Sequence, residues 1–551
     1  MFKENNQLQM FGFEMDLNQS LQDQLAKTEE KAFYDLVFVN INEMDYKVLY
    51  SDNVSRPNIP INILVSALVL KERKKWSFNE LIDSICFDMR TKVALGLSRL
   101  DEKPFSRATI FNFQKRILSY YQETGIHLLE QTFNNFTEKQ LKSIEIKTNI
   151  QRSDSTLISS NIKKYSRVEL LIEVLLRFWR ELEDSDKKKF VSLVDPYSKR
   201  GSEKYVYTLK STDLPKELDK LGCLYSSLYQ NFSFKYSQNE AYKNFDRVFF
   251  EHFTIVENNA IYFENNQLDS GILQSPDDSD ATYRKKRKQE SQGFTLNATE
   301  TAHPDNEVQI LTDIHITENN VDDSKILENK IDEIFSKTPD LEELHTDGGY
   351  GSEAVDEKMA EKNITHVPTA IKGRQAAVPL VITKDEEGDQ YQVECEGQKV
   401  ESVPTKTRYK VIFDKTKCQN CPLKEKCQIV KNKGVYYFSH SDYLKNQRNQ
   451  NLYKIPPERR KIRPNVEATI REFKAKTNGG KLKVRGLFKA KLFAFAMGIS
   501  INFGRIFRYF VQKNGSFYSF FLFVNKISYL SRILNFYKQI KNQDFYFQKS
   551  A

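Results

Sequence analysis

The chain contains no long hydrophobic run. Its longest apolar stretch, Phe517–Val524, is far shorter than the roughly 20 residues that cross a bilayer. Charged residues make up 28% of the 551 residues, and the mean hydropathy is −0.59. The opening residues, MFKENNQLQMFGF, lack the apolar segment that follows a basic start in a signal peptide. These absences predict a soluble protein that stays in the cytoplasm and enters no membrane.

Cysteine is also scarce, with six in the whole chain, which argues against a disulfide scaffold. Three of them crowd into the motif Cys418-x2-Cys421-x5-Cys427. Clustered cysteines in a cytoplasmic protein indicate metal rather than disulfides. Three thiolates are one short of a closed tetrahedral zinc site. Cys395 is the first candidate for the fourth ligand and His440 the second, although three unrelated buried cysteines would give the same pattern.

Positive charge is distributed unevenly along the chain. Between Glu458 and Lys513 there are fifteen Lys or Arg and three Glu, a local charge of +12, which leaves −3 for the rest of a chain of net charge +9. A second basic run occupies Arg284–Lys288. Such patches attract the phosphate backbones of nucleic acids. For the short run at 284–288, an ordinary solvated surface explains the sequence equally well.

Length and shifts in pattern divide the chain into parts, since 551 residues are enough for two or more domains. We expect a polar N-terminal arm, an all-α domain, an α/β domain and an aromatic tail, at residues 1–56, 57–135, 136–515 and 516–551. A helical insertion at about 165–270 and the cysteine-bearing insertion at about 371–450 interrupt the α/β domain. The second insertion is polar and is expected to have little core of its own, so a structural Zn²⁺ would help to order it.

Three helices are predicted in the all-α domain. The first is the apolar run at 60–72, and the second begins with a capping box at Ser77 and continues to Phe87. The third follows Ser106 and carries the basic residues Arg107, Lys115 and Arg116. This order resembles a helix-turn-helix DNA-binding layout. An ordinary helical bundle gives the same spacing.

A mixed sheet with flanking helices is predicted for the α/β domain. Strands are expected at 144–150, 294–300, 308–316, 341–347 and 364–369, with the second and third forming a hairpin and a helix at 322–336 before the fourth. Another helix is capped by Ser352. Asp154 lies just beyond the first strand and Asp347 closes the fourth. Because ligand sites in such sheets lie at the carboxyl ends of strands, both aspartates are candidates for a functional site.

A third acidic candidate, Glu467, lies in a helix predicted at 457–477 and stopped by Gly479-Gly480. Its apolar stripe is formed by Val466, Ile470 and Phe473, and the basic residues Arg463, Arg471 and Lys474 gather beside Glu467 on the flank of that stripe. Glu472 falls on the far side. We therefore prefer Glu467 to Glu472, although Pro464 could begin this helix or kink it.

Three carboxylates are enough to hold the pair of magnesium ions that phosphodiester cleavage uses, because magnesium prefers oxygen ligands and keeps several waters. Each acid also has an ordinary explanation. Asp347 precedes Gly-Gly and could only form a turn, and Asp154 lies between two serines and could cap a segment. Glu467 could be an exposed helical glutamate.

The motifs around these acids resemble those of DDE transposases from bacterial insertion sequences. Arg463-x3-Glu467-x6-Lys474 is similar to their arginine, glutamate and lysine signature, with Arg460 in place of the usual leading tyrosine. Asp-Ser-Thr at 154–156 and Asp-Gly-Gly-Tyr-Gly-Ser at 347–352 resemble their two aspartate motifs. Further similarity to the insertion-sequence family numbered eleven-eighty-two covers roughly residues 55–510, including RPNIPINILVSALVL, Tyr283-Arg-Lys-Lys, Val484-Arg-Gly486 and Asn502-Phe-Gly-Arg505.

This resemblance implies a ribonuclease-H-like catalytic domain that holds two Mg²⁺ or Mn²⁺ ions with Asp154, Asp347 and Glu467, Asp154 bridging both. It implies hydrolysis that frees a 3′-hydroxyl at the end of the element, followed by attack of that hydroxyl on target DNA. The partners would be double-stranded DNA of the element ends and the target, and a second copy of the chain in a DNA-bound homodimer, with the protein associated with the nucleoid. DNA-binding residues are predicted at Arg463, Arg471, Lys474, Lys483, Arg485, Arg107, Lys115 and Arg116.

Two other functions use the same features. A metal-dependent DNA nuclease without strand transfer needs the same carboxylates. A domesticated DNA-binding protein would keep zinc and helix-turn-helix modules without catalysis, and the presence of all three carboxylates argues against it.

Overall fold

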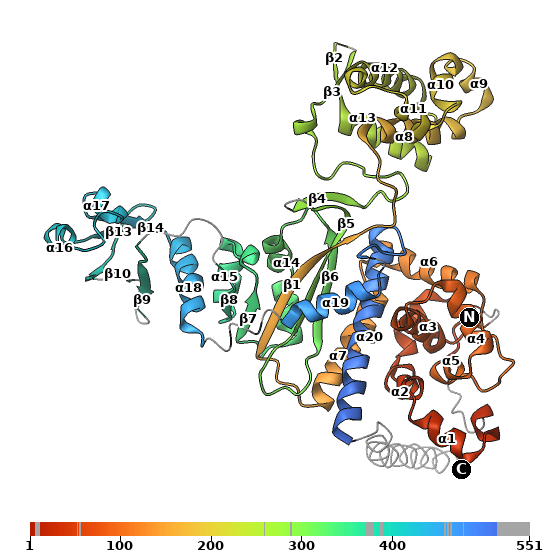
Figure 1. Ribbon diagram of the computed structural model, residues 1–551, viewed down its shortest axis with the longest axis horizontal. Coiled ribbons are helices and arrows are strands. Elements are labelled where there is room, and N and C mark those ends of the chain that lie inside the picture. The colour runs from red at the N-terminus through yellow and green to blue at the C-terminus, as the bar shows by residue number, and fades with distance from the viewer. Residues whose placement is uncertain are drawn as a thin grey trace, which may run out of the picture. The chain divides into compact units, whose positions relative to one another are not determined.

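The computed structural model describes residues 1–5, 12–51, 53, 57–257, 259–286, 289–370, 378–385, 390–395, 397–456, 459, 462, 465–477 and 479–514 (Figure 1). The chain forms two compact units. Unit 1 comprises Met1–Thr148, Glu300–Asp313 and the chain from Phe495 onward, and unit 2 comprises Asn149–Thr299 and Ile314–Ala494.

Unit 1 is mainly helical. Its helices in the N-terminal part are α1 (Gln19–Ala26), α2 (Glu29–Leu36), α3 (Ile61–Lys74), α4 (Phe78–Phe87), α5 (Met89–Ala94), α6 (Arg107–Thr124) and α7 (Leu128–Ser143). The first 56 residues, predicted as a polar arm with a short helix, contain the two helices α1 and α2, and Phe33 and Tyr46 are buried in the core. Their short apolar segments were too brief to show helical periodicity.

The three helices predicted in this region correspond to α3, α4 and α6, and the capping box at Ser77 is present. The short helix α5 follows α4 directly, with Asp88 ending one and capping the other. Residues 95–106 then separate α5 from α6. That connection is longer than the turn of three or four residues in a helix-turn-helix. Helix α6 is therefore part of a helical bundle and does not follow α5 in a helix-turn-helix motif.

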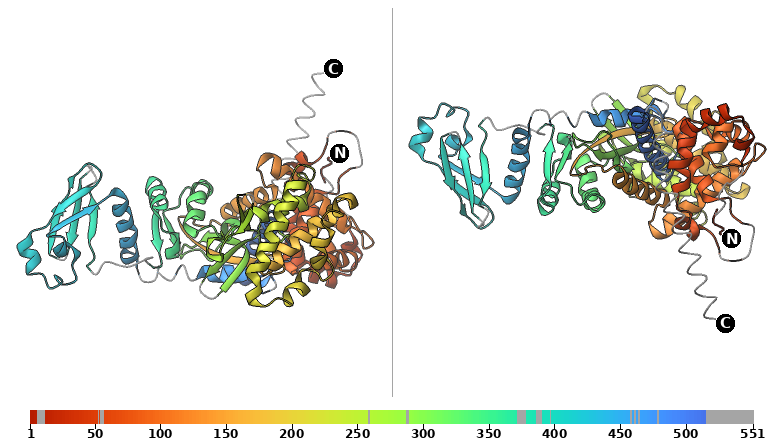
Figure 2. Two further views of the ribbon diagram at one scale, coloured as in Figure 1. Left: turned by 90° about the horizontal axis from the view of Figure 1, so that it is seen from above. Right: turned by 90° about the horizontal axis from the view of Figure 1, so that it is seen from below.

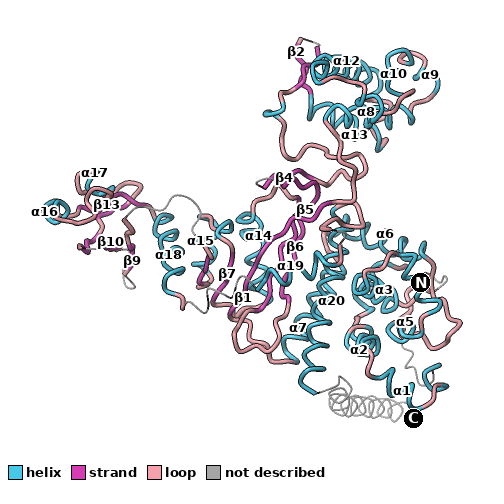
Figure 3. Tube along the Cα trace, viewed as in Figure 1, coloured by secondary structure: helices cyan, strands magenta, loops and turns pink. Residues whose placement is uncertain are grey.

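The central sheet contains six strands within the described residues, and it is mixed (Figures 1 and 3). Its order is β4 (Thr282–Lys286), β5 (Gln289–Thr301), β1 (Ile150–Ser159), β7 (Glu343–Thr346) and β8 (Thr365–Pro368), with β6 (Leu311–Glu318) also paired to β5. Strands β1, β7 and β8 are parallel, whereas β4 is antiparallel to β5. Helices α14 (Asp323–Lys337) and α15 (Glu353–Glu361) follow β6 and β7 along the chain.

The prediction for the first strand was wrong. Residues 144–149 are not a strand, and β1 begins at Ile150 and passes through Asp154. The alternation in IEIKTNI suggested a strand, but the buried strand is polar: Ser153 donates to Asn297 (Oγ to Oδ1, 2.8 Å) and receives from Thr299 (Oγ1 to Oγ, 3.1 Å). These hydrogen bonds satisfy buried hydroxyls, which the hydrophobic pattern cannot reveal. The hairpin, the later strands, helix 322–336 and the helix capped by Ser352 are confirmed as β5–β6, β7, β8, α14 and α15.

The helical insertion has its own hydrophobic core. It contains α8 (Arg167–Glu181), α9 (Asp184–Lys187), α10 (Val191–Ser198), α11 (Ser202–Tyr207), α12 (Leu214–Phe232) and α13 (Glu240–His252), followed by the hairpin β2 (Phe253–Val256) and β3 (Asn259–Tyr262). These helices appear in yellow and yellow-green in Figure 2. Tyr225 stacks on Phe245 within this core, with ring centroids 4.4 Å apart.

The cysteine-bearing insertion also has a core, which corrects the prediction that it has little. It is built of β9 (Val381–Lys384), β10 (Tyr391–Cys395), β11 (Gln398–Glu401), β12 (Val403–Pro404), β13 (Tyr409–Ile412), α16 (Lys415–Gln419), α17 (Gln428–Lys431) and β14 (Val435–Phe438). Val393, Val411, Phe413 and Phe438 are almost completely buried. The apolar residues are spread over short strands separated by polar turns, so they merge into a core only when the strands pair.

Three further helices complete the described chain: α18 (His440–Lys454), α19 (Val466–Ala475) and α20 (Leu487–Asn514). The helix predicted at 457–477 begins only at Val466, and Arg460, Arg463 and Pro464 lie outside the described residues. Within the described chain, the segment Leu487–Lys513 is long and apolar enough to cross a membrane by length and composition, and 83% of its most apolar window is buried inside the protein. That burial is typical of a core helix.

Candidate active site

Asp154 and Asp347 lie at the same level of two adjacent parallel strands. In the pairing of β1 with β7, Arg152 stands opposite His345. Asp154 and Asp347 each come two residues later, Asp154 still within β1 and Asp347 directly after β7. Because paired strands are about 4.8 Å apart and side chains alternate with a period of two, this register makes the two carboxylates neighbours although 192 positions separate them in the sequence.

Backbone N–H groups orient both carboxylates. Asp154 Oδ1 accepts from the Ser155 amide at 2.9 Å, and Asp347 Oδ1 accepts from the Gly348 amide at 2.7 Å. Asp154 is 8% exposed, and Asp347 is half-buried. Each aspartate therefore has one oxygen held by a backbone N–H of the following residue.

The third predicted acid, Glu467, is exposed in the first turn of α19, a helix that packs against β1. Val466, Thr469, Ile470 and Phe473 form the buried face of α19. A cleft of about 810 Å³ beside β1 is lined by Arg471 and Lys474, which lie one and two turns after Glu467 on the same helix face. Glu467 is therefore on the helix face that carries the basic cleft residues.

The cleft joins residues from four separate parts of unit 2. Ser155 of β1, Arg284 and Lys286 of β4, Asp323 of α14 and the two basic residues of α19 all line it. None of the three predicted acids lines the cleft itself: Asp154 precedes Ser155, which does, and Glu467 lies on the α19 face that carries Arg471 and Lys474.

Asp323 is a fourth carboxylate of this region that sequence patterns did not identify. Ser155 Oγ donates to Asp323 Oδ1 at 2.7 Å, and a Cβ placed on Gly349 would lie 3.5 Å from Asp323 Oδ2. Asp323 thus lies between the residue after Asp154 and the turn after Asp347. In the sequence it belongs to an acidic pair at the start of a helix, a common helix-start signal, and only the packing of α14 reveals its position.

Tyr350 belongs to the motif that begins at Asp347, and its hydroxyl lies near Asp154 of the other aspartate motif. Its ring is completely buried, and its hydroxyl accepts from Asn297 Nδ2 at 3.1 Å. Burial raises the pKa of this hydroxyl well above its ordinary value, and the nearby charges of Asp323 and Asp154 raise it further. Tyr350 therefore stays neutral and keeps its proton.

A buried polar network supports the loop that carries Asp347. Thr346 Oγ1 donates to the Asp347 carbonyl at 3.0 Å and lies 2.8 Å from His366 Nε2. On the other side, Arg448 of α18 donates to both carboxylate oxygens of Asp356, at 2.7 and 2.6 Å. Burial lowers the pKa of His366, so this ring is neutral near pH 7. Helix α18, which follows the cysteine-bearing insertion, therefore braces the helix that begins just after Asp347.

The predicted acids suit magnesium in their chemistry, because carboxylate oxygens are its preferred protein ligands. They are not gathered around one point: among the described residues, no group of three or more His, Cys, Asp or Glu side chains is arranged to hold a metal ion.

The remaining predicted DNA-binding residues have different surroundings. In unit 2, Lys483 is exposed, whereas Arg485 donates to the Asn161 carbonyl at 2.7 Å and lies 3.5 Å from Asp277. In unit 1, Arg107, Lys115 and Arg116 are all exposed on α6. Arg107 donates to Asn79 at 2.9 Å, and Arg116 covers the ring of Tyr50 at 4.8 Å. Arg463 lies outside the described residues.

The β10–β11 hairpin brings Cys395 toward Cys418. Cys395 pairs with Gln398 across the hairpin, and the Gln398 side chain accepts from the Asp414 amide at 2.8 Å and donates to its carbonyl at 3.2 Å. The side-chain nitrogen Nε2 of Gln398 also donates to Cys418 Sγ at 3.4 Å. Gln398 therefore clamps the hairpin to the start of α16.

The four cysteines of the insertion are free thiols that lie near one another, although among the described residues they do not form a group arranged to hold a metal ion. Cys418 and Cys427 are buried, and Cys395 and Cys421 are partly buried. Burial raises the pKa of the Cys418 thiol, and the proximity of Cys395, Cys427 and Cys421 raises it further. His440, the other candidate ligand, instead lies 2.8 Å from the Tyr391 hydroxyl, which favours Cys395 as the fourth member.

Two protein-family models match parts of the chain. The family model described as Transposase DDE domain matches residues 388–507, and the one described as Transposase domain (DUF772) matches residues 20–116. The first match contains Glu467 and the four cysteines but neither Asp154 nor Asp347; the second covers α1 to α5 and part of α6. No curated protein and no solved structure matches the chain.

Proposed function

We propose that this chain, an enzyme that its DDE match identifies as a transposase acting on DNA, cuts the ends of an insertion sequence and joins each freed 3′-hydroxyl to target DNA. The observation that carries the proposal is the register of β1 and β7, which makes Asp154 and Asp347 neighbours beside a basic cleft. We also propose that the element belongs to the insertion-sequence family numbered eleven-eighty-two.

A ribonuclease-H-like fold for the central sheet is part of this proposal. The strand order supports it: the β5–β6 hairpin lies on one side of β1, and the parallel strands β7 and β8 lie on the other. In this arrangement one acid comes from the central strand, one from the end of its parallel neighbour and one from the helix packed against the central strand.

Asp154, Asp347 and Glu467 would hold two Mg²⁺ or Mn²⁺ ions, since DDE transposases generally use divalent metals. Such ions activate the attacking oxygen and neutralise the leaving oxygen of an in-line phosphoryl transfer. Arg471 and Lys474 would bind the phosphates on either side of the bond that is cut, because both are exposed in the cleft and have no ion-pair partner among the described residues. A homodimer bound to DNA would bring the two ends of the element together. The protein would act in the cytoplasm, associated with the nucleoid.

Strand transfer separates this function from that of a nuclease. We expect the protein to join a pre-cleaved end with a free 3′-hydroxyl to a plasmid target when Mg²⁺ is present. The substrate is the DNA that flanks the reading frame, chosen for its inverted repeats. Joined product on a sequencing gel supports transposition. Cleavage of an uncut end without any joined product would identify a metal-dependent nuclease, and DNA binding without either step would identify a domesticated binding protein.

We further propose a structural Zn²⁺ bound by Cys395, Cys418, Cys421 and Cys427. The support is the hairpin clamp that brings Cys395 to Cys418, together with the partial or complete burial of all four thiols. Zinc with four thiolates is tetrahedral and closed, as in structural sites. The insertion has its own core, so the metal would add to its stability rather than create its fold.

Zinc content tests this site directly. The wild-type protein is expected to hold about one zinc ion per chain, measured by mass spectrometry of the metal after purification. Cys427→Ser should lose this zinc and lower the melting temperature. Cys223→Ser is the matched control, because Cys223 is exposed in the helical insertion, and it should keep both values. A wild-type protein that takes up no zinc when zinc is supplied would show that the cysteines are only core residues.

A further inference from the structure

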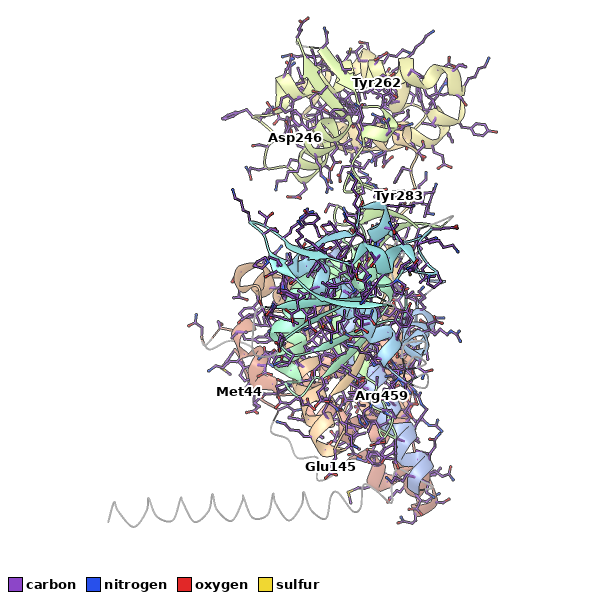
Figure 4. All side chains as sticks on the ribbon, turned by 90° about the vertical axis from the view of Figure 1, so that its left-hand side faces the viewer. Met44, Glu145, Asp246, Tyr262, Tyr283 and Arg459 are labelled. Atoms are coloured by element: carbon purple, nitrogen blue, oxygen red, sulfur yellow. The ribbon has the colours of Figure 1, made fainter. Side chains whose placement is uncertain are left out.

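The basic run at 284–288 was the charged feature of the sequence without an assigned role. Its described part forms β4, which stands at one end of the central sheet and pairs with β5. Tyr283, the residue before Arg284, marks this strand in Figure 4. Arg287 and Lys288 lie outside the described residues. The position of β4 matters because the strand forms part of the cleft beside β1.

Three consecutive basic residues of β4 have different surroundings. Arg284 Nη1 donates to the carbonyls of Asn319 and Val321, at 3.1 and 3.0 Å, and so holds the loop before α14. Lys285 is neutralised by Glu290, 2.9 Å away across the strand pair. Lys286 is exposed, lines the cleft and has no hydrogen-bond or ion-pair partner among the described residues.

The opposite wall of the cleft is basic as well. Arg471 and Lys474 of α19 are exposed there, and within the described residues neither has an ion-pair partner. The acidic side chains that line the cleft are Glu290 and Asp323. Glu290 is paired with Lys285, so Asp323, which accepts from the neutral Ser155 hydroxyl, is the one acidic charge among these lining residues that stands against Lys286, Arg471 and Lys474. Uncompensated positive charge therefore faces the cleft from two walls that are almost 190 positions apart in the sequence.

We propose that β4 is a second DNA-binding wall of the active site, on which Lys286 binds a backbone phosphate of the strand that enters the cleft, opposite Arg471 and Lys474. Exposed lysines without carboxylate partners bind phosphates by releasing condensed counterions, and a cleft with positive charge on both sides concentrates the field on its contents. Arg284 orients the wall by holding the loop that leads to Asp323. The proposal rests on the proposed function, because it takes the cleft as the site where DNA is cut.

Salt dependence of DNA binding tests this contact, with Lys286→Gln and its neighbour Lys285→Gln as a matched pair. Both variants remove one positive charge from the same strand, but only Lys286 faces the cleft unpaired. Binding of a duplex carrying the element end is measured by fluorescence anisotropy without divalent metal, over a series of salt concentrations. For Lys286→Gln, the magnitude of the negative slope of log Kobs against log salt should fall by about 0.9, the value for one lost phosphate contact on duplex DNA. Lys285→Gln should leave the slope unchanged.

A double variant tests whether both walls hold the same DNA. Lys286→Gln combined with Arg471→Gln should reduce the magnitude of the slope by about 1.8, twice the value for one contact. Melting temperatures of all variants should match the wild type, since these side chains are exposed. An unchanged slope for Lys286→Gln, with salt-dependent wild-type binding, would overturn the inference and leave the proposed function standing. Wild-type protein that shows neither salt-dependent binding nor strand transfer would instead overturn the proposed function.

Discussion

Replacing Asp347 with Asn is expected to lower the rate of DNA strand cleavage about a thousandfold, while DNA binding is retained. Loss of a carboxylate proposed to hold the metal ions would remove several kcal/mol of charge stabilisation in the transition state, and each 1.36 kcal/mol is a factor of ten in rate. The Gly348 N–H donates to Asp347 Oδ1 at 2.7 Å, and the amide oxygen of an Asn side chain can accept the same hydrogen bond. The loop should therefore keep its conformation. The measurement is single-turnover cleavage of a labelled element end.

A surface aspartate close in the sequence provides the control for this variant. Asp340 is exposed in the segment before β7, and Asp340→Asn removes the same charge. Its cleavage rate should stay within about twofold of wild type, as expected for a surface substitution. Unchanged cleavage and strand transfer by Asp347→Asn would show that Asp347 is only a turn residue and that the assignment of the acidic site is wrong.

The second large effect is expected for Glu467→Gln, with a loss of cleavage of about a hundredfold or more. The reason is the removal of a charge that we propose to bind metal, at a residue whose helix face carries Arg471 and Lys474 of the cleft. Binding of the element end should persist. Raising the Mg²⁺ concentration, or replacing it with Mn²⁺, should recover part of the rate if the side chain acts through the metal.

Glu472 is the matched control on the same helix. It lies five residues after Glu467, which is about 140° around the helix axis, and it is half-buried rather than exposed. Glu472→Gln should therefore change cleavage by no more than about twofold. The opposite result, with Glu472→Gln inactive and Glu467→Gln active, would assign the third acid to Glu472.

Local signals in the sequence predicted many elements correctly because their causes are local. The capping box at Ser77 begins α4, and Ser352 caps α15. The apolar stripe of α19 was also identified correctly, as Val466 and Phe473 are completely buried. Cap hydrogen bonds and helix periodicity involve residues three or four positions apart, so a single sequence contains the information for them.

The first strand shows where local reasoning failed. The alternating segment 144–150 had the better strand pattern, yet β1 begins where that segment ends and contains Ser153 and Asp154. Buried polar groups are stable in a strand when hydrogen-bond partners surround them, and here those partners come from β5. The choice between the two segments depends on residues more than 140 positions away.

Sequence alone supplied the candidate groups of this protein: the two aspartate motifs, the arginine, glutamate and lysine motif, the cysteine motif and the concentration of positive charge near the C-terminus. Tertiary structure decided which of these groups meet. The strand register places Asp154 level with Asp347, and the packing of α14 brings Asp323 next to Ser155. The pairing of β4 places Arg284 and Lys286, from a basic run whose role the sequence left open, along one side of a cleft. Residue types specify which chemistry is available, whereas register and helix packing arise from contacts between distant segments that no local pattern encodes.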